Sequence, residues 1–179
     1  RDWSSDVCSP DLDPTFFAGH RRGGGCVGLC AAYYDRKSPA RIIELVRALP
    51  RRRFLLVGRG WRDCPDFPAL QRLPNFEYRE ARYADYPACY REMDVFVSLA
   101  ALEGGPIPLV EAMMSNVVPV ATGTGFAPDL IRDGVNGHLC AVDAPVAEVA
   151  ALVERAFASA ADVRATVEHL TWRRFAQIG

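Results

Sequence analysis

Short apolar runs alternate with amphipathic segments along most of the chain. The apolar runs predict β-strands at Val27–Ala31, Phe54–Val57, Phe76–Arg79, Val95–Leu99, Val117–Ala121 and His138–Ala141. After the first run, apolar residues recur at helical spacing behind Ser38, which we expect to cap a helix that has Pro39 in its first turn. Similar patterns predict helices over Asp85–Met93, Ile107–Ser115 and Pro145–Ala158, and a last helix that starts at Thr171 and buries Trp172 and Phe175.

This alternation predicts the fold class. Parallel strands need crossover connections, and helical crossovers on both faces give an α/β fold with a Rossmann-like, doubly wound parallel sheet. Pro119 is unusual inside a strand because proline has no N–H to donate to a neighbouring strand. We keep the strand because Val118 and Val120, on either side, are apolar and β-branched.

The N-terminal part of the chain has a different character. Residues 1–12 are polar and acidic and resemble translated sequencing-adapter sequence, so we expect a non-native scar there. Residues 13–25 are rich in glycine and arginine, which indicates a linker rather than a packed element. Residues 26–179 then form one domain. The chain starts with Arg1 rather than methionine, which indicates a fragment.

Composition excludes some classes of function. The 179 residues have a formal net charge of −1, and a general nucleic-acid binder has a basic face, so we expect no nucleic-acid partner. No apolar stretch reaches the roughly 20 residues of a transmembrane helix. The six cysteines show no metal-ligand spacing, which predicts no metal site and buried free thiols in a reducing cytoplasm. Lys37 is the single lysine among 21 basic residues, and a compact ammonium suits phosphate.

Residues able to do chemistry gather after the predicted strands. In a doubly wound sheet, ligands bind outside the carboxyl ends of the strands. The loops there carry small, aromatic and charged residues, namely Tyr33–Lys37, Gly58, Gly60, Glu103–Gly105, Gly123 and Gly125. The loops that follow helices carry ordinary turn residues. The sequence therefore predicts a ligand site at one edge of the sheet.

The most informative segment is EGGPIPLVEAMM, which begins at Glu103. Gly104 and Gly105 let the backbone approach a ligand closely, and free N–H groups at the start of the following helix suit an anion such as a diphosphate. Glu111 lies about one turn into that helix among apolar residues. Two interpretations stay open: Glu111 is buried with a partner such as a sugar hydroxyl, or it faces solvent and favours the helix dipole.

Arg36 and Lys37 end the first strand-to-helix loop, where they could meet the same phosphates. The alternative is a solvated pair of cations. A helix start argues against that alternative, because positive charge beside the positive end of a helix dipole is unfavourable without an anion.

Several motifs resemble one enzyme family. EGGPIPLVEAMMSNVVPVATGTGFAPDLI is similar to the E-x7-E signature of retaining GT-B glycosyltransferases of family four. FLLVGRGW resembles the second strand and glycine turn of that family, DVFVSLAALE the strand before the signature, and VNGHLCAVDA the tail of the domain. The resemblance extends from Val27 to Phe175, and it indicates the C-terminal, donor-binding domain of such an enzyme.

The resemblance implies an activity. The family has two facing Rossmann-like domains and moves a sugar, here a hexose as the expected class, from a nucleotide sugar to an acceptor with retention of configuration. The acceptor, a glycan, a lipid or a small molecule, would bind to an N-terminal domain that is missing from this chain, so the chain alone would be inactive. The resemblance implies no metal or other cofactor. With its free thiols, we expect the enzyme in the cytoplasm, with peripheral membrane attachment as an option.

The resemblance also implies roles for individual residues. Glu103 would be catalytic and contact sugar hydroxyls near the reacting carbon, with the amides of Gly104 and Gly105 beside it. Arg36 and Lys37 would neutralise the diphosphate. Glu111 would bind the ribose hydroxyls, and Gly58 would let its loop approach the nucleotide. These residues form the predicted donor site.

The chain departs from the family pattern in two places. Ala32 stands where the family usually has an arginine, for which Arg36 is a candidate replacement, and the aromatic residue between the two glycines is missing. The first departure leaves open a non-catalytic nucleotide-binding module of a degenerate relative. A nicotinamide-dependent oxidoreductase is disfavoured, because neither glycine pair that follows a strand has the third glycine of the dinucleotide fingerprint.

Overall fold

A computed structural model describes residues 14–19 and 23–171. The strands are β1 (Cys26–Cys30), β2 (Arg53–Val57), β3 (Phe76–Arg79), β4 (Val95–Ser98), β5 (Val118–Thr122) and β6 (His138–Cys140). The helices are α1 (Pro39–Ala48), α2 (Phe67–Gln71), α3 (Tyr86–Tyr90), α4 (Ile107–Met114), α5 (Ala127–Leu130) and α6 (Val146–Ala158). Every predicted strand is present, and its ends shift by at most one residue.

The strands form a parallel sheet in the order β3-β2-β1-β4-β5-β6. β1 lies in its middle, where Val27 is opposite Phe54 of β2 and Val95 of β4. The chain builds outward from β1 to β3, crosses back to β4 and builds outward again to β6. The strand order therefore reverses between β1 and β4, which is where ligands bind in doubly wound sheets. The predicted fold class is confirmed.

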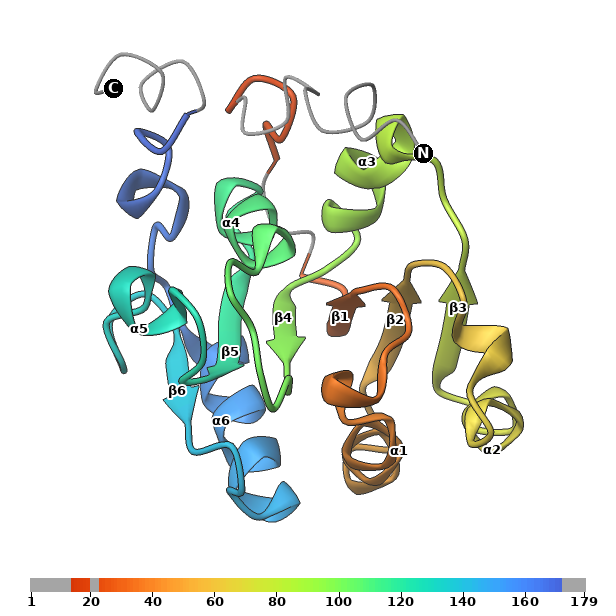
Figure 1. The fold of residues 1–179 in the computed structure, drawn as a ribbon. Helices are drawn as coiled ribbons and strands as arrows, with labels where there is room; N and C mark the ends of the chain where they lie inside the picture. The colour runs from red at the N-terminus through yellow and green to blue at the C-terminus, as the bar shows by residue number, and fades with distance from the viewer. Residues whose placement is uncertain (1–13, 20–22, 172–179) are drawn as a thin grey trace.

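Helices cover both faces of the sheet (Figure 1). α1, α2 and α6 lie on one side, where α6 packs against α1 and against β4 and β5. α3 and α4 lie on the other side, and α4 packs against the same two strands. Each longer helix buries one apolar stripe; in α6 the stripe includes Val149, Val153 and Ala156, as its spacing predicts.

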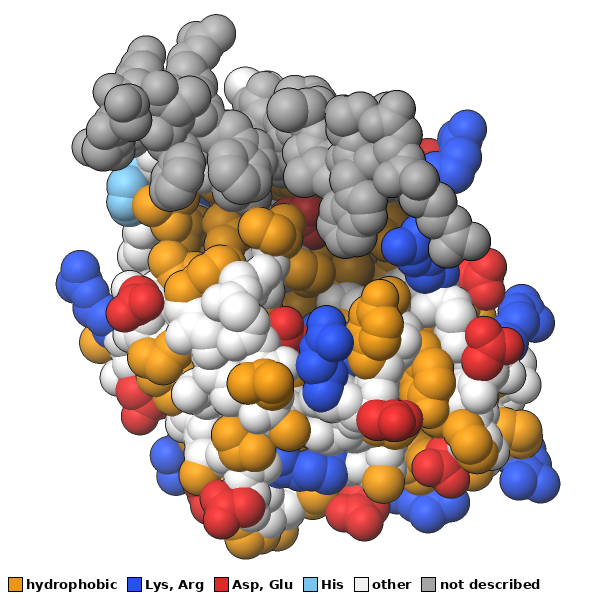
Figure 2. Space-filling view, in the orientation of Figure 1, with side chains coloured by type: hydrophobic (Ala, Val, Ile, Leu, Met, Phe, Trp, Pro, Cys, Tyr) orange, Lys and Arg blue, Asp and Glu red, His pale blue; other side chains and the backbone are white. Residues whose placement is uncertain are grey.

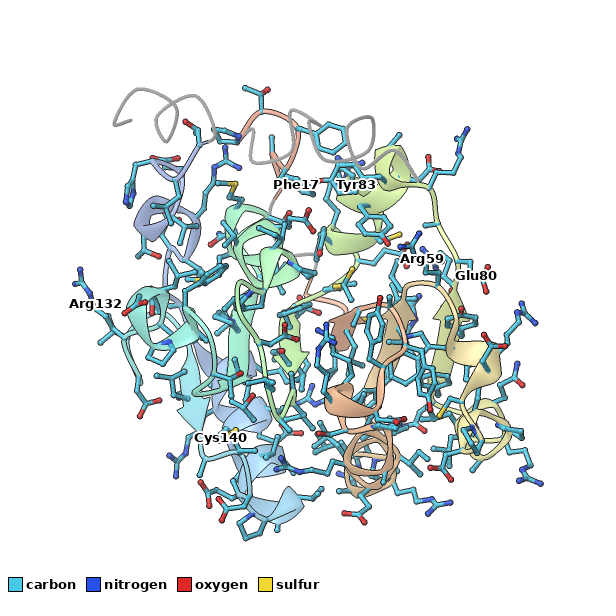
Figure 3. The ribbon with its side chains drawn as sticks, viewed as in Figure 1. Phe17, Arg59, Glu80, Tyr83, Arg132 and Cys140 are labelled. Atoms are coloured by element: carbon cyan, nitrogen blue, oxygen red, sulfur yellow. The ribbon has the colours of Figure 1, made fainter. Side chains whose placement is uncertain are left out.

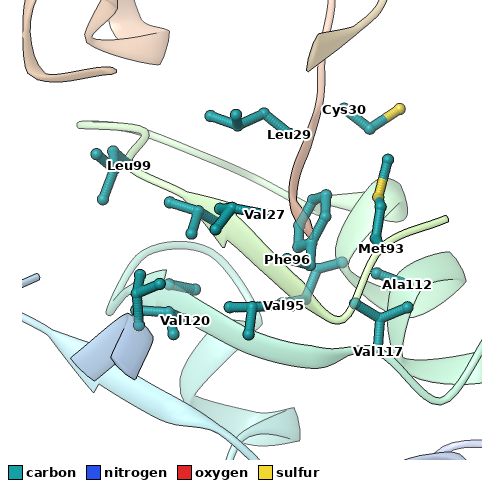
Figure 4. Close-up of a cluster of buried hydrophobic side chains, with 14 of the residues drawn as sticks. Val27, Leu29, Cys30, Met93, Val95, Phe96, Leu99, Ala112, Val117 and Val120 are labelled. Carbon is teal, nitrogen blue, oxygen red and sulfur yellow. The ribbon is translucent and has the colours of Figure 1, made fainter. Parts of the chain in front are cut away.

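The core is continuous across β1, β4, β5 and α4 (Figure 4). Val27, Val95 and Val120 are fully buried, as expected for parallel strands that are covered on both faces. Gly28 is the one residue of β1 without a side chain, and the position of Met93 explains why. A Cβ at Gly28 would lie 2.0 Å from the Met93 sulfur, so the glycine makes room for that side chain.

Pro119 does lie inside β5, opposite Phe96 of β4. The N–H of Val118 donates to the Asp94 carbonyl at 3.2 Å, on the β4 side. Because successive residues of a strand face opposite sides, the Pro119 nitrogen points away from β4. The pairing of β5 with β6 begins only at Val120, so the missing N–H breaks no ladder bond.

Ser38 precedes α1 as predicted, but it does not cap the helix with its side chain. Its φ is 55°, in the left-handed region, and its hydroxyl makes no capping hydrogen bond. A 3-10 turn over Asp35–Lys37 leads into this conformation. A capping serine usually has extended backbone, which aims its oxygen at the helix amides. The capping prediction is wrong, whereas Pro39 does begin the helix.

Other helix predictions need smaller corrections. α3 is shorter than Asp85–Met93, because a separate 3-10 turn over Tyr83–Asp85 precedes it and turns follow it. α2 and α5 were not predicted, because helices of five and four residues are too short to show a periodic pattern. The helix expected from Thr171, with Trp172 and Phe175, lies outside the described residues.

Part of the expected linker is packed. Phe17 is fully buried, and the Arg164 side chain donates to the carbonyls of Pro14 at 2.7 Å and Phe17 at 3.2 Å. For residues 14–19, this corrects the expectation that no packed element precedes the domain. The glycine-rich composition indicated a linker, but the large side chain of Phe17 is enough to pack this segment against the domain.

The five described cysteines are buried free thiols, as predicted, and Cys8 lies outside the described residues. Burial raises the pKa of both Cys26 and Cys30 to about 12. Within residues 14–19 and 23–171, no helix is both long and apolar enough to cross a lipid bilayer.

Candidate functional site

The loops after β1 and β4 meet where the strand order reverses. The N–H of Ala101 donates to the Arg36 carbonyl at 2.8 Å, and Lys37 forms an ion pair with Glu103 across the same gap. The two charged side chains are 17% and 9% exposed, respectively. Figure 2 shows basic and acidic side chains beside a recess with hydrophobic walls near the middle of the molecule. Two predicted site residues from distant parts of the sequence are therefore in direct contact.

Arg36 and Lys37 differ in their surroundings. The ion pair with Glu103 shows that Lys37 is not a solvated cation. Arg36 is exposed, and its guanidinium lies 4.5 Å from the ring centroid of Tyr34. The structure therefore brings only Lys37 into contact with another predicted site residue through its side chain.

The glycine turn after β4 is open on one side. Nothing lies within 4 Å of a Cβ placed on Gly104, whereas a Cβ on Gly105 would lie 2.7 Å from the Phe126 ring. Among the described residues, no protein acceptor takes a hydrogen bond from the N–H of either glycine. The loop after β5 thus supports the turn from behind, and two backbone donors remain free beside the Lys37–Glu103 pair.

The first turn of α4 has fewer free N–H groups than the sequence predicted. Pro106 and Pro108 have no N–H, and the N–H groups of Ile107 and Leu109 donate to the carbonyls of Gly105 at 2.8 Å and Pro106 at 2.9 Å. The expectation of free N–H groups at this helix start is therefore wrong for residues 106–109. The N–H groups that remain between the prolines are used by carbonyls of the same turn. A ligand would meet the amides of the glycine turn instead.

Gly58 holds two loops of the site together. It has a φ of 154°, and a Cβ on it would lie 1.9 Å from the carbonyl oxygen of Ala31. The same carbonyl accepts a hydrogen bond from the Trp61 indole at 2.7 Å. The contact explains why glycine stands at this position whether or not its loop also approaches a nucleotide.

A cavity of about 30 Å³ is lined by residues that include Lys37, Trp61 and Pro106. Pockets for nucleotide-sized ligands take several hundred Å³. A nucleotide would therefore lie over the loops and not inside this cavity.

Glu111 is buried in α4 and is only 1% exposed. One carboxylate oxygen accepts a hydrogen bond from Tyr83 and the other from Tyr90, both at 2.7 Å. The solvent-facing interpretation is wrong. The interpretation of a buried carboxylate with a partner is right, although here two phenols act as partners.

Burial, together with the neighbouring Cys30 and Glu111, raises the pKa of Tyr90 well above its usual range. Its hydroxyl therefore keeps its proton and remains a donor to Glu111. Each carboxylate oxygen has two lone pairs, so an oxygen that accepts one phenol bond can still accept another.

Sequence reasoning missed the tyrosines around Glu111. Tyr83, Tyr86 and Tyr90 are spaced by three and four residues, which places them on one face of a helical segment. That pattern was readable, but nothing in it pointed to a carboxylate 21 residues further along the chain. Figure 3 shows Tyr83 beside Phe17, another aromatic residue that the sequence did not single out.

The described residues, 14–19 and 23–171, contain no group of three or more His, Cys, Asp or Glu side chains that could hold a metal ion. The charged groups of the site include the Lys37–Glu103 pair, Arg36 and Glu111.

Comparison with protein families decides the assignment. Residues 25–159 match the family model described as "Glycosyl transferases group 1". The chain belongs to the group 1 glycosyltransferases. No curated protein sequence matches this group 1 glycosyltransferase chain.

Solved structures support the fold of this group 1 domain. The C-terminal domain of a glycosyl transferase group 1 family protein (LpcC) from Francisella tularensis is 19% identical with a TM-score of 0.70, and the alignment covers 92% of this chain and 96% of that one. Alr3699/HepE from Anabaena, in complex with UDP and glucose, is 21% identical with a TM-score of 0.74, covering 90% and 50%. Sucrose-phosphate synthase from Thermosynechococcus elongatus is 15% identical with a TM-score of 0.81, covering 93% and 48%.

At these identities the likenesses show a shared fold. The chain spans almost the whole LpcC domain but only about half of HepE and of the synthase. The group 1 domain described here therefore has the fold of the C-terminal half of a GT-B glycosyltransferase.

Proposed function

We propose that this domain binds a nucleotide sugar at the carboxyl edge of its sheet and supplies the donor half of a retaining, E-x7-E glycosyltransferase of family four. Family membership and the GT-B fold support a transferase. HepE, a neighbour in fold, has been solved with UDP-glucose, which supports a nucleotide sugar as donor and hexosyl transfer as the reaction.

The observation that carries the proposal is the Lys37–Glu103 pair at the reversal of strand order. A basic and an acidic side chain, both partly exposed, stand there beside the free N–H groups of Gly104 and Gly105. A sugar diphosphate needs both kinds of group: cations and N–H donors for its phosphates, and a carboxylate for its sugar hydroxyls.

Donor binding would exchange partners within this pair. Lys37 would leave Glu103 for a phosphate oxygen, with Arg36 contributing charge from the same loop. Glu103 would then accept hydrogen bonds from sugar hydroxyls near the reacting carbon. As the diphosphate leaves, the cations stabilise its growing negative charge, and the carboxylate stabilises the oxocarbenium-like sugar. No metal is needed in this scheme.

Glu111 would bind the ribose hydroxyls, because a carboxylate can accept several hydrogen bonds at once. Gly58 keeps the loop after β2 against the loop after β1, which leaves backbone rather than a side chain facing the nucleotide. These roles make Glu103 the catalytic residue, and Arg36, Lys37, Gly58, Gly104, Gly105 and Glu111 the donor-binding residues.

The acceptor, a glycan, a lipid or a small molecule, would bind to a second domain in front of this one. The chain alone would then bind donor and transfer little sugar. We place the enzyme in the cytoplasm, with peripheral membrane attachment as an option. Robust transfer by the 179-residue chain alone would contradict the need for a second domain.

One observation favours a second candidate function. Ala32 offers no charge to a phosphate, and Lys37 is already paired with Glu103. A site without an arginine at position 32, and with its lysine already paired, would suit a non-catalytic nucleotide-binding module. Donor binding without transfer, in a longer protein that also carries the preceding domain, would support this alternative.

Calorimetric titration of the chain with UDP-, GDP- and ADP-glucose tests the proposed site. We expect one donor to bind, and Glu111→Gln to weaken it about tenfold or more, since a hydrogen bond to a charged group contributes about 1.5–3 kcal/mol. The amide keeps the volume of the carboxylate, so the folded core should survive, which a thermal melt checks.

Glu44→Gln is the matched control, because Glu44 is an exposed glutamate on α1, on the opposite face of the sheet. It should leave the affinity unchanged. Absence of binding to any of the three donors by a folded chain, or equal affinity in the Glu111 variant, would refute the proposed site.

A further inference from the structure

Residues 14–19, which we call the strap, lie above α4 and beside α3 in the view of Figure 1 (red), and their two phenylalanine rings contact aromatic residues of α3 and of the turn before it. The Phe17 ring makes edge-on contacts with Tyr90, at a centroid distance of 5.7 Å, and with Tyr83, at 6.2 Å. Phe16 stacks on Tyr83 at 5.8 Å. Phe17 is fully buried, so the strap inserts a side chain into the domain instead of lying on its surface.

A second set of contacts fixes the strap. Arg164 donates to the carbonyls of Pro14 and Phe17, and to the carbonyl of Met114 at 2.8 Å. Met114 is the last residue of α4, the helix that carries Glu111. One guanidinium therefore ties the strap to the end of that helix. The ring of Phe17 and the side chain of Arg164 hold the strap at two separate points.

The two rings that Phe17 contacts belong to the two tyrosines that hydrogen-bond Glu111 (Figure 3). A phenol hydroxyl lies in the plane of its ring, so the position of the ring determines where the hydroxyl points. Edge-on aromatic contacts favour particular ring orientations by about 0.5–1.5 kcal/mol. Packing at Phe17 thus restricts the two phenols that donate to the carboxylate.

We infer that Phe17 is a positioning residue for the donor site: the strap orients Tyr83 and Tyr90, and these orient the Glu111 carboxylate toward the ribose. The inference rests on the proposed function, because it gives Glu111 a ribose to bind. Its consequence is that a segment on the N-terminal side of β1 affects donor affinity. Movement of the strap on α3 would reach Glu111 through two rings and two hydrogen bonds.

The test measures recognition of the ribose rather than overall affinity. Calorimetry gives the affinities of UDP, GDP and ADP and of their 2′-deoxy counterparts, and the ratio of each pair reports the hydrogen bond to the 2′-hydroxyl. For the diphosphate that binds tightest, we expect a ratio of about tenfold in the wild type, as for a bond to a charged acceptor. Phe17→Leu should lower that ratio several-fold toward one.

Phe67→Leu is the matched control. Phe67 lies on α2, is 3% exposed, and makes a comparable edge-on contact with Tyr78 at 4.9 Å, on the other face of the sheet. It should cost similar stability in a thermal melt and leave the ratio unchanged. Phe17→Met, with a flexible side chain that fills the same space, is measured in parallel in case the leucine variant does not fold.

Tyr90→Phe removes one phenol donor and should also lower the ratio. Combined with Phe17→Leu, it should lower the ratio less than the sum of the two effects, because both act through one carboxylate. A wild-type ratio retained in both Phe17 variants would overturn the inference alone. If the wild type binds no diphosphate, or Glu111→Gln keeps the wild-type ratio, the proposed function of Glu111 fails first.

Discussion

At the scale of single residues, the surroundings of each predicted site residue decide its role. Glu111 is a buried carboxylate because two phenols satisfy it, and Lys37 lies close to Glu103 because two loops cross at the centre of the sheet. From sequence alone, Gly58 could be an ordinary turn residue. In the structure, glycine is needed at this position because any side chain would collide with the Ala31 carbonyl and separate the two loops.

Gly58→Ala should lower the free energy of unfolding by about 3 kcal/mol, because a side chain at a φ of 154° is strained and its Cβ would collide with the Ala31 carbonyl. Urea unfolding measures the change. Gly104→Ala is the control for stability, since a Cβ there meets nothing within 4 Å. Equal stability of the two variants would show that the loops separate without cost.

At the scale of elements, the edge strand β3 is joined to its neighbours by an ion-pair network. Arg53 of β2 pairs with Glu77 at 2.7 Å and with Glu92 at 2.9 Å, and Arg79 pairs with Glu92 at 2.7 Å. The network links β2, β3 and the turn after α3. Charged side chains on an edge strand also discourage pairing with other chains.

Glu92→Gln should cost about 1 kcal/mol at pH 7, because the network is partly exposed. Arg79, and with it Arg53, lowers the pKa of Glu92 below its usual value near 4.5, against an opposing effect of burial. A lowered pKa stabilises the fold above pH 4.5, and this contribution disappears as the pH falls through the folded-state pKa.

Unfolding in urea at pH 7 and pH 3 compares this variant with wild type. The difference should be present at pH 7 and smaller at pH 3. Glu44→Gln, outside the network, should show little difference at either pH. A cost for Glu92→Gln that stays the same at both pH values would mean that the charge of Glu92 does not stabilise the fold.

At the scale of the whole molecule, one core extends from the strap to α6. The five described cysteines all belong to that core and are buried. Burial raises the pKa of Cys26 and Cys30 to about 12 from an ordinary value of 9.0. A thiol in this state is both inaccessible and protonated, so it reacts only when the domain opens.

A Cys8→Ser variant should therefore react slowly with a thiol reagent at pH 8 in native buffer, and all five remaining thiols should react quickly in denaturant. The time course of absorbance from an aromatic disulfide reagent measures both rates. A single thiol that reacts quickly under native conditions would reveal a part of the core that opens by itself.

The sequence was enough to predict the strands, most of the helices and the fold class, because strands and helices space their apolar residues differently and both spacings follow from backbone geometry. Each strand was predicted within one residue, and the alternation with helices fixed a parallel sheet and the edge at which polar loops gather. Pro119 could be kept in a strand on the apolar character of its neighbours. The residues Lys37, Glu103 and Glu111 were recognised from loop position and motif.

Tertiary structure alone decided which of these residues touch. The order of the strands, which no local pattern encodes, places the loops after β1 and β4 side by side and so pairs Lys37 with Glu103. Likewise, Tyr90 reaches Glu111, and Phe17 reaches Tyr90, only because α3, α4 and the strap pack on the same face of the sheet. Contacts between residues far apart in sequence depend on how whole elements pack, so only the tertiary structure reveals them.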